Sequence, residues 1–216
     1  MFFPQLIAGP IVHHSEIIPQ LEQHKRLPFF IDNFHKGVII LSIGLIKKIV
    51  LAHQMALVSD HYFELTSTCF IEAWLASLGF GLQIYFDFSG YTDMAIGLAL
   101  MYGLKIPKNF NQPYRAVNIE EFWRRWHLTL TRWFESYLYT PLALFLLRRK
   151  SGFLTEAIPL LTSFILIGLW HGPTVNFVFF GLVHGMSLMV YRLWAQTRYR
   201  LPQSLSYLLS LMVISI

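Results

Sequence analysis

The sequence has 216 residues, of which 55% are hydrophobic and only 13% are charged, with a formal net charge of +5 at pH 7 and a mean hydropathy of +0.48. Soluble domains carry roughly 25% charged residues, so the composition excludes a disordered chain, a coiled coil, a collagen-like repeat and a disulfide scaffold. The one cysteine, Cys69, cannot form an internal disulfide. Because the apolar residues gather in long runs, the sequence predicts an all-α integral membrane protein.

The first two apolar runs contain charged residues. Residues 37–59 have the length of a membrane-spanning helix but include Lys47 and Lys48. A lysine at mid-depth costs about 2.5–3.5 kcal/mol on insertion scales, so this pair must reach the interface, face the protein interior or mark the end of a span. Residues 72–104 are too long for one span. Since Asp87 and Asp93 lie among them, they predict one helix, a polar break and a second, tilted or partial helix.

The next segment, residues 105–131, is polar and aromatic and does not span. Asn118, with Glu121 three residues later, predicts the N-terminus of a helix. At about 100° per residue, the aromatic residues that follow share one face of this helix, and the arginines share the other. His127 falls near the edge of the aromatic face. The pattern is typical of an amphipathic helix that lies in the membrane interface.

Residues 134–147 are apolar, but the run is short and contains Pro141, which predicts a re-entrant or interfacial segment. Residues 153–170 and 175–194 are the two clearest spans. They are separated by a turn that begins at His171 and contains a glycine and a proline. Residues 204–216 form an apolar run shorter than the roughly 20 residues of a span, so we expect a truncated last helix.

The basic residues indicate orientation. They gather beside the two clearest spans at Arg148, Arg149, Lys150, Arg192, Arg198 and Arg200. Two crossings return the chain to the same side, so both clusters can be cytoplasmic, with the His171 turn toward the opposite face or inside the bilayer. Such flanking charges fit lipid headgroups. A nucleic-acid partner is not expected, because no basic face is formed. We expect one membrane domain over residues 1–216.

Three histidines lie in or beside the apolar segments. His171 is a functional candidate because histidines within membranes are rare. For His127, a packed aromatic face and a proton-transfer role both remain open. His184 lies between Gly181 and Gly185 and is explained more simply as a helix-packing residue. The sequence contains no H-E-x-x-H, paired C-x-x-C, G-x-S-x-G or P-loop motif, so neither a metal site nor a permanently bound cofactor is expected.

Several ordered blocks resemble the membrane-bound O-acyltransferase family, and within it the membrane subunits that O-acetylate alginate and similar polysaccharides. The blocks are FPQLIAGPI at 3–11, YFDFSGYTDMAIG at 85–97, NFNQPY at 109–114, EFWRRWHLTL at 121–130, WHG at 170–172, NFV at 176–178 and GLVHG at 181–185. The similarity covers most of the chain. It implies a multi-pass helical bundle with re-entrant and interfacial amphipathic helices.

The resemblance also implies an activity. An acyl group, expected to be acetyl, would pass from a cytoplasmic thioester such as acetyl-CoA to hydroxyls of an exported polysaccharide such as alginate, directly or through a partner protein. The enzyme would lie in the bacterial inner membrane. Its partners would be lipid, the acyl donor, the polysaccharide and extracytoplasmic acetyltransferase proteins.

Roles for individual residues follow from the same resemblance. His171 matches the principal active-site histidine of the family, and His127 matches the second. Candidates for the substrate path are Asp87, Asp93, Asn111 and Trp170, although hydrogen bonding within the fold is an equally good interpretation of the two aspartates and the asparagine.

The sequence departs from the family pattern in two places, and we expect the N-terminal part of the family's membrane core to be absent. Glu135 and Ser136 stand where relatives usually have Arg and Asp, and residues 143–145 replace a glycine-rich turn. Both changes lie on the expected donor side. We therefore expect residues 1–216 to form a partial acyltransferase domain.

Other functions remain open at this stage. Within the same family, D-alanyl transfer to teichoic acid would use a carrier-protein thioester. Intramembrane aspartates and histidines also serve ion pathways, so a transporter or channel is an alternative. A fragment that only scaffolds partner proteins is a third.

Overall fold

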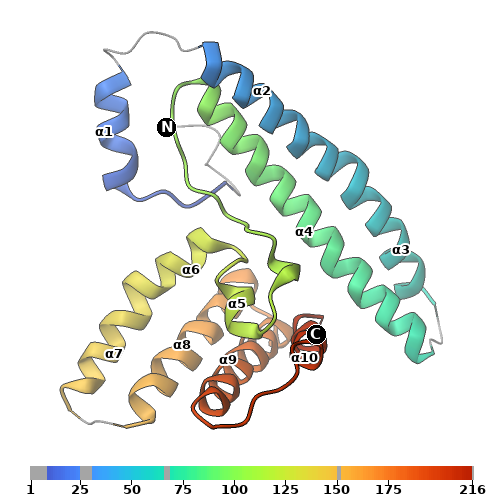
Figure 1. The fold of residues 1–216 in the computed structure, drawn as a ribbon, viewed down its shortest axis with the longest axis vertical. Coiled ribbons are helices and arrows are strands. Elements are labelled where there is room, and N and C mark those ends of the chain that lie inside the picture. Colours follow the sequence, from blue (N-terminus) through green and yellow to red (C-terminus); the bar gives the residue numbers. More distant parts are fainter. Residues whose placement is uncertain (1–8, 25–30, 66–68, 150–151, 216) are drawn as a thin grey trace. The chain divides into compact units, whose positions relative to one another are not determined.

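The computed structural model describes residues 9–24, 31–65, 69–149 and 152–215, and within these ranges every regular element is a helix (Figure 1). The predicted all-α class is therefore confirmed. The chain divides into two compact units, Met1–Phe110 and Asn111–Ile216, which we call the N-terminal and the C-terminal unit and describe separately. The single membrane domain expected over residues 1–216 stays a prediction.

The N-terminal unit is built around two long antiparallel helical segments. The first consists of α2 (Ile31–Ile46), a π-helical turn (Lys47–Ala52) and α3 (His53–Phe63), which run on as one apolar helix of 33 residues. The second is α4 (Phe70–Met101), which lies alongside α2 and α3 (Figure 1). A shorter helix, α1 (His14–His24), precedes them.

The predicted polar break in residues 72–104 is wrong, because α4 continues for 32 residues without interruption. The helix accommodates its polar residues without a break. Ser89 and Thr92 are buried, and the Thr92 hydroxyl donates to the Ser89 carbonyl of its own helix. The two aspartates of the segment are paired with lysines of the neighbouring helix. Because the aspartates are paired with lysines of the neighbouring helix, α4 remains continuous at these positions.

The two long segments are in close contact at Gly90. A Cβ atom there would lie 2.7 Å from the Gly44 carbonyl oxygen and 3.1 Å from Cβ of Lys47. The helices therefore touch, and the consecutive lysines reach the carboxylates that lie three residues before and after Gly90. Lys47 Nζ is 2.5 Å from Asp93 Oδ2, and Lys48 pairs with Asp87.

We call Lys47, Lys48, Asp87 and Asp93 the ion-pair clasp. The sequence left three placements open for Lys47 and Lys48: at the interface, facing the protein interior, or at the end of a span. Both face the partner helix α4, where opposite charges compensate part of the cost of removing them from water. The π-helical turn begins at Lys47, so the clasp lies where the regular α-helix of the first segment ends.

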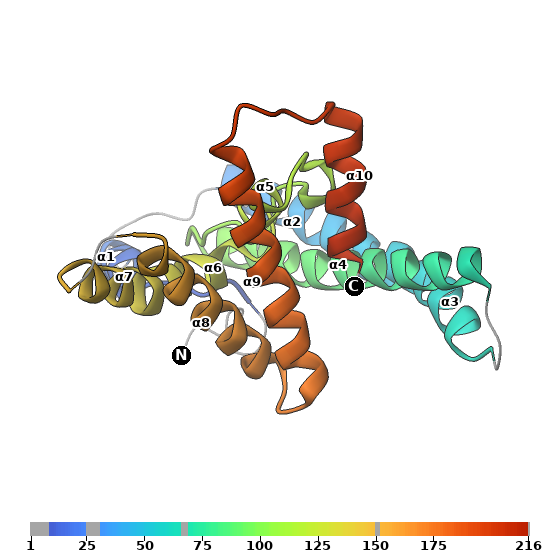
Figure 2. The same ribbon diagram turned by 90° about the horizontal axis from the view of Figure 1, so that it is seen from below.

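The C-terminal unit contains a short 3₁₀ turn and a series of helices. These are the turn Pro113–Arg115, α5 (Ile119–Trp123), α6 (Leu128–Phe134), a π-helical turn (Glu135–Tyr139), α7 (Thr140–Leu147), α8 (Leu154–His171), α9 (Val175–Ala195) and α10 (Gln203–Ile214). Figure 2 shows the loop that leads from α9 into α10. The buried centre of the unit joins residues of α5, α8 and α9, among them Trp123, Phe164 and Leu188.

The two clearest predicted spans are confirmed as α8 and α9. Together with the 33-residue segment of the N-terminal unit, they are the three described helices that are long and apolar enough to cross a membrane. Small residues let α8 and α9 pack closely. A Cβ on Gly168 would lie 2.1 Å from the Phe177 carbonyl oxygen, and one on Gly181 would lie 2.3 Å from the Phe164 carbonyl oxygen.

The continuous amphipathic helix predicted from Ile119 is wrong in one respect. Helix α5 ends at Trp123, and α6 begins only at Leu128, after His127 has adopted a left-handed backbone conformation. From α6 the chain remains helical to the end of α7. Pro141 does not interrupt it, because this proline lies in the first turn of α7, directly after the π-helical turn. Hydrophobic periodicity carries no signal for a single residue in the left-handed conformation, so the break at His127 was not predicted.

Candidate active site

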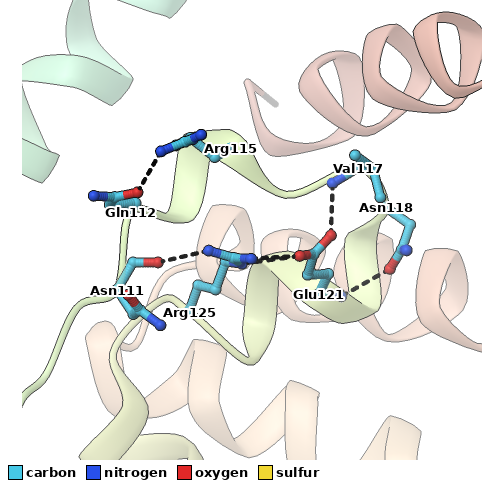
Figure 3. A network of polar contacts seen from close by, with 7 residues as sticks. All are labelled: Asn111, Gln112, Arg115, Val117, Asn118, Glu121 and Arg125. Atoms are coloured by element: carbon cyan, nitrogen blue, oxygen red, sulfur yellow. Dashed lines mark hydrogen bonds and ion pairs between the residues drawn. The ribbon is translucent and has the colours of Figure 1, made fainter.

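The start of α5 is fixed by a polar network around Glu121 (Figure 3). The Glu121 backbone N–H donates to Asn118 Oδ1 at 2.8 Å, as the predicted helix cap requires. The Glu121 carboxylate accepts from the Val117 backbone N–H at 2.9 Å and from Arg125 Nη2 at 2.6 Å. The hydrogen bond from Val117, aided by Arg125, lowers the pKa of Glu121. The network therefore holds a carboxylate at the positive end of a short helix.

Arg125 carries this network to the beginning of the unit. Its Nη1 donates to the Asn111 carbonyl at 3.3 Å (Figure 3). The Asn111 backbone N–H donates to the Arg125 carbonyl at 2.9 Å. Asn111, a predicted substrate-path residue, is exposed, and its backbone helps to fix the chain just before His127. Its part in a substrate path stays a prediction.

His127 is placed by this turn in an unusual conformation. Its φ and ψ angles are 43° and 52°, in the left-handed region that costs a non-glycine residue of order 1–3 kcal/mol. Its side chain is nevertheless only 4% exposed. Burial and, as a smaller contribution, the charge of His171 lower the pKa of His127 to about 4. His127 is therefore neutral at pH 7. The surrounding structure keeps its backbone in a strained conformation.

His171 is the last residue of α8. The helix ends there because Gly172 is its cap, with an N–H that donates to the Gly168 carbonyl at 3.3 Å. A Cβ on Gly172 would lie 2.6 Å from the Phe177 ring, so a larger residue here would displace that ring. The His171 ring stacks on Phe177 with a centroid distance of 6.0 Å and is exposed. The C-terminal end of α8 thus carries an accessible imidazole that stacks on an aromatic ring.

Trp170 links the two histidines. Its ring centroid lies 6.3 Å from that of His127 and 4.9 Å from that of His171. The structure therefore brings His127 together with the adjacent residues Trp170 and His171, which lie far from it along the chain. We call His127, Trp170 and His171 the histidine site.

The two predicted aspartates belong to the N-terminal unit. Asp87 and Asp93 each have an ion-pair partner in that unit, Lys48 and Lys47 respectively. This pairing supports the structural interpretation that the sequence left open. Their place on a substrate path stays a prediction.

His184 is a residue that the sequence interpretation treated only as packing. It is 2% exposed, and its ring contacts Phe180 at 4.5 Å and Trp123 at 5.2 Å between centroids. Phe180 also contacts the His171 ring at 6.0 Å. An available signal was the spacing of four residues between Phe180 and His184, which places both on one face of α9.

The chemistry open to the histidine site is that of two imidazoles in unlike surroundings. One is exposed at a helix end, and the other is buried and neutral. Near neutral pH an imidazole can accept a proton from a hydroxyl group, whereas a buried neutral ring can orient a polar group by hydrogen bonding. Among the described residues, no group of three or more His, Cys, Asp or Glu side chains could hold a metal ion.

Comparison with known proteins identifies relatives along nearly the whole chain. The model of the membrane-bound O-acyltransferase family matches residues 1–209. The peptidoglycan O-acetyltransferase of Helicobacter pylori is 44% identical over 220 aligned residues, covering 100% of this chain and 41% of the relative. A probable alginate O-acetylase of Pseudomonas aeruginosa is 42% identical over 88% of this chain and 35% of the relative.

A more distant relative carries a different acyl group. The teichoic acid D-alanyltransferase of Bacillus subtilis is 27% identical over 88% of this chain and 49% of its own length. The chain thus spans half or less of the length of each of these three relatives.

Proposed function

The chain belongs to the membrane-bound O-acyltransferase family, and from this premise we propose that it forms part of an enzyme that O-acetylates an exported glycan. The donor is a cytoplasmic thioester such as acetyl-CoA, and the acceptor is a hydroxyl group of a polysaccharide of the peptidoglycan or alginate kind. Two relatives, named as a peptidoglycan O-acetyltransferase and a probable alginate O-acetylase, support this class of acceptor.

The observation that carries the proposal is the histidine site. His171, exposed at the end of α8, accepts the proton of the acceptor hydroxyl while the oxygen attacks the thioester carbonyl. A carbon–oxygen bond forms, the carbon–sulfur bond breaks, and the thiolate leaves and takes up the proton from His171. General-base assistance of this kind contributes about 10²–10⁴-fold to the rate.

His127 has a different role in this proposal. A group with a pKa of about 4 is a poor base at pH 7, because it binds a proton only weakly. It remains a hydrogen-bond donor through one ring nitrogen. His127 therefore orients the thioester carbonyl or the acceptor, with Trp170 between it and His171.

The proposed enzyme lies in the bacterial cytoplasmic membrane, where a donor from one side can meet an acceptor at the other. Its apolar helices and bacterial relatives support this location. Extracytoplasmic acetyltransferase proteins that receive the acyl group or pass it on are the expected partners.

The test uses the full-length protein in proteoliposomes, with acetyl-CoA labelled in the acetyl group and isolated glycan. His171→Ala should lower acetyl transfer by at least about 100-fold without lowering the melting temperature. His53→Ala, at an exposed histidine of α3, is the matched control and should retain transfer. Normal turnover by His171→Ala would contradict the assignment of His171 as the base.

D-alanyl transfer to teichoic acid is the second candidate, favoured by the Bacillus subtilis relative. It requires a D-alanyl carrier-protein thioester, so the two donors offered separately to the same protein distinguish the two activities. Family membership favours acyl transfer over the transporter and scaffold alternatives. Ion flux through proteoliposomes that lack any acyl donor would support a transporter instead.

A further inference from the structure

Two polar atoms in the centre of the C-terminal unit lack a hydrogen-bond partner among the described residues. They are Nδ1 of His184 and Nε1 of Trp123. Both side chains are buried, and their rings meet at 90° with centroids 5.2 Å apart. An indole N–H only donates, whereas an imidazole Nδ1 can accept or donate. The two contacting rings therefore carry complementary hydrogen-bonding atoms.

His184 cannot readily turn away to find a partner elsewhere. Helix α9 is locked against α8 on both sides of it, because a Cβ on Gly181 would lie 2.3 Å from the Phe164 carbonyl oxygen and one on Gly185 would lie 3.1 Å from Phe164 Cβ. The neighbouring rings of Phe164 and Phe180 are apolar. Polar atoms enclosed in this way are unfavourable unless a hydrogen-bonding group reaches them.

We propose that Trp123 and His184 form a binding site for one uncharged hydroxyl group, which accepts from Trp123 Nε1 and donates to His184 Nδ1. The group is small, because both side chains are buried. Two sources share this chemistry: an ordered water molecule and a hydroxyl of the acceptor glycan. The site lies behind Phe180, whose ring contacts both His184 and His171. The glycan source rests on the proposed function, whereas the water source does not.

The test is a double-variant cycle on the full-length protein in nanodiscs, with Trp123→Phe, His184→Phe and the two combined. A bound hydroxyl makes the changes non-additive, because either single variant leaves one polar atom without its bridge and the double variant leaves none. With water as the source, each single variant lowers the apparent melting temperature by about 2–6 °C without substrate, and the double variant is no worse than the poorer single variant.

With a glycan hydroxyl as the source, the melting temperatures are additive without substrate. The non-additivity then appears in the KM for the acceptor, while the KM for the acetyl donor is unchanged. Additive effects in both measurements would overturn the site. The melting cycle remains informative if no acetyl transfer is found, so a failure of the proposed function is distinguishable from a failure of the site.

A high-resolution map of the wild-type protein tests the site even if a phenylalanine variant does not fold. Density within hydrogen-bond distance of both Trp123 Nε1 and His184 Nδ1 is expected. A direct bond between these two nitrogens would overturn the proposal.

Discussion

The two units place polar residues within apolar helices in opposite ways. In the N-terminal unit, the ion-pair clasp joins each lysine to an aspartate on the neighbouring helix. In the C-terminal unit, His171 and His184 lie among aromatic rings, and Nδ1 of His184 has no partner within the described part of the chain. Compensated charges hold helices together, whereas imidazoles among apolar rings are available for chemistry or binding.

The difference follows from the cost of removing charge from water. A charged side chain in an apolar span persists only when it is paired or reaches a polar region, and removing one partner leaves an uncompensated charge. A neutral imidazole avoids most of that cost and keeps its hydrogen-bonding capacity. In our proposal, the clasp therefore holds helices together, and the histidine site carries the chemistry.

The largest expected effect on folding comes from breaking the better buried half of the clasp. Asp93→Asn leaves Lys47 without its counter-ion and should lower the free energy of unfolding by about 1–3 kcal/mol, less than for a fully buried pair because both side chains are about a quarter exposed. The double variant Lys47→Met with Asp93→Leu removes both charges and should recover most of the loss. Denaturation in mild detergent measures both. A double variant that is less stable than Asp93→Asn would contradict the ion-pair interpretation.

The outer half of the clasp provides an internal comparison. Lys48 and Asp87 are 41% and 51% exposed, so the protein encloses this pair less than it encloses Lys47 and Asp93. Asp87→Asn should therefore be less destabilising than Asp93→Asn in the same assay. Equal losses would show that exposure does not decide the strength of these pairs.

A comparable effect is expected at the contact between α8 and α9. Gly168→Ala would place a methyl group 2.1 Å from the Phe177 carbonyl oxygen, so the helices must separate, at a cost of about 1–3 kcal/mol. Since Phe177 stacks on His171, acetyl transfer should fall as well. Gly152→Ala provides a contrast, because a Cβ there meets nothing within 4 Å, although its positive φ adds local strain. A Gly168→Ala protein with unchanged stability and activity would contradict the close packing.

The pH dependence of stability tests the buried state of His127. Its folded pKa of about 4 lies below the ordinary value of 6.5, so between these values the unfolded chain binds more protons than the folded one. Stability from this group is complete above pH 6.5 and is lost as the pH falls toward 4. Melting temperatures across this range should fall less steeply for His127→Gln than for the wild type. Parallel curves would contradict the burial of a neutral imidazole.

The smallest expected effect concerns the cap of α5. Asn118→Ala removes the acceptor for the Glu121 N–H and should cost about 1 kcal/mol. Asn118→Asp keeps an acceptor and should be close to the wild type. Because α5 precedes the turn that carries His127, the alanine variant should also lower acetyl transfer more than its small loss of stability suggests. An alanine variant with wild-type stability would show that the cap contributes nothing.

Much of the fold could be predicted from composition and periodicity. The two clearest spans and the cap at Asn118 were predicted correctly, since each depends on local sequence. The continuity of α4 was not, because Asp87 and Asp93 look like a polar break until their lysine partners are known. Such pairing joins residues about 40 positions apart and leaves no local pattern.

The candidate site shows the same division. The resemblance to a family indicated His127, Trp170 and His171, and the structure brings their rings together. Neither the left-handed backbone of His127 nor the contact of His184 with Trp123 could be predicted. The first depends on the network around Arg125, and the second depends on how α5 packs against α9.

The contrast between the two units is tested most directly by comparing two variants of the full-length protein in one assay. We predict that His171→Gln folds with an unchanged melting temperature but loses acetyl transfer by at least about 100-fold. The double variant Lys47→Met with Asp93→Leu should keep transfer within a few-fold of the wild type. Loss of transfer by the folded clasp variant, with normal transfer by His171→Gln, would contradict the account.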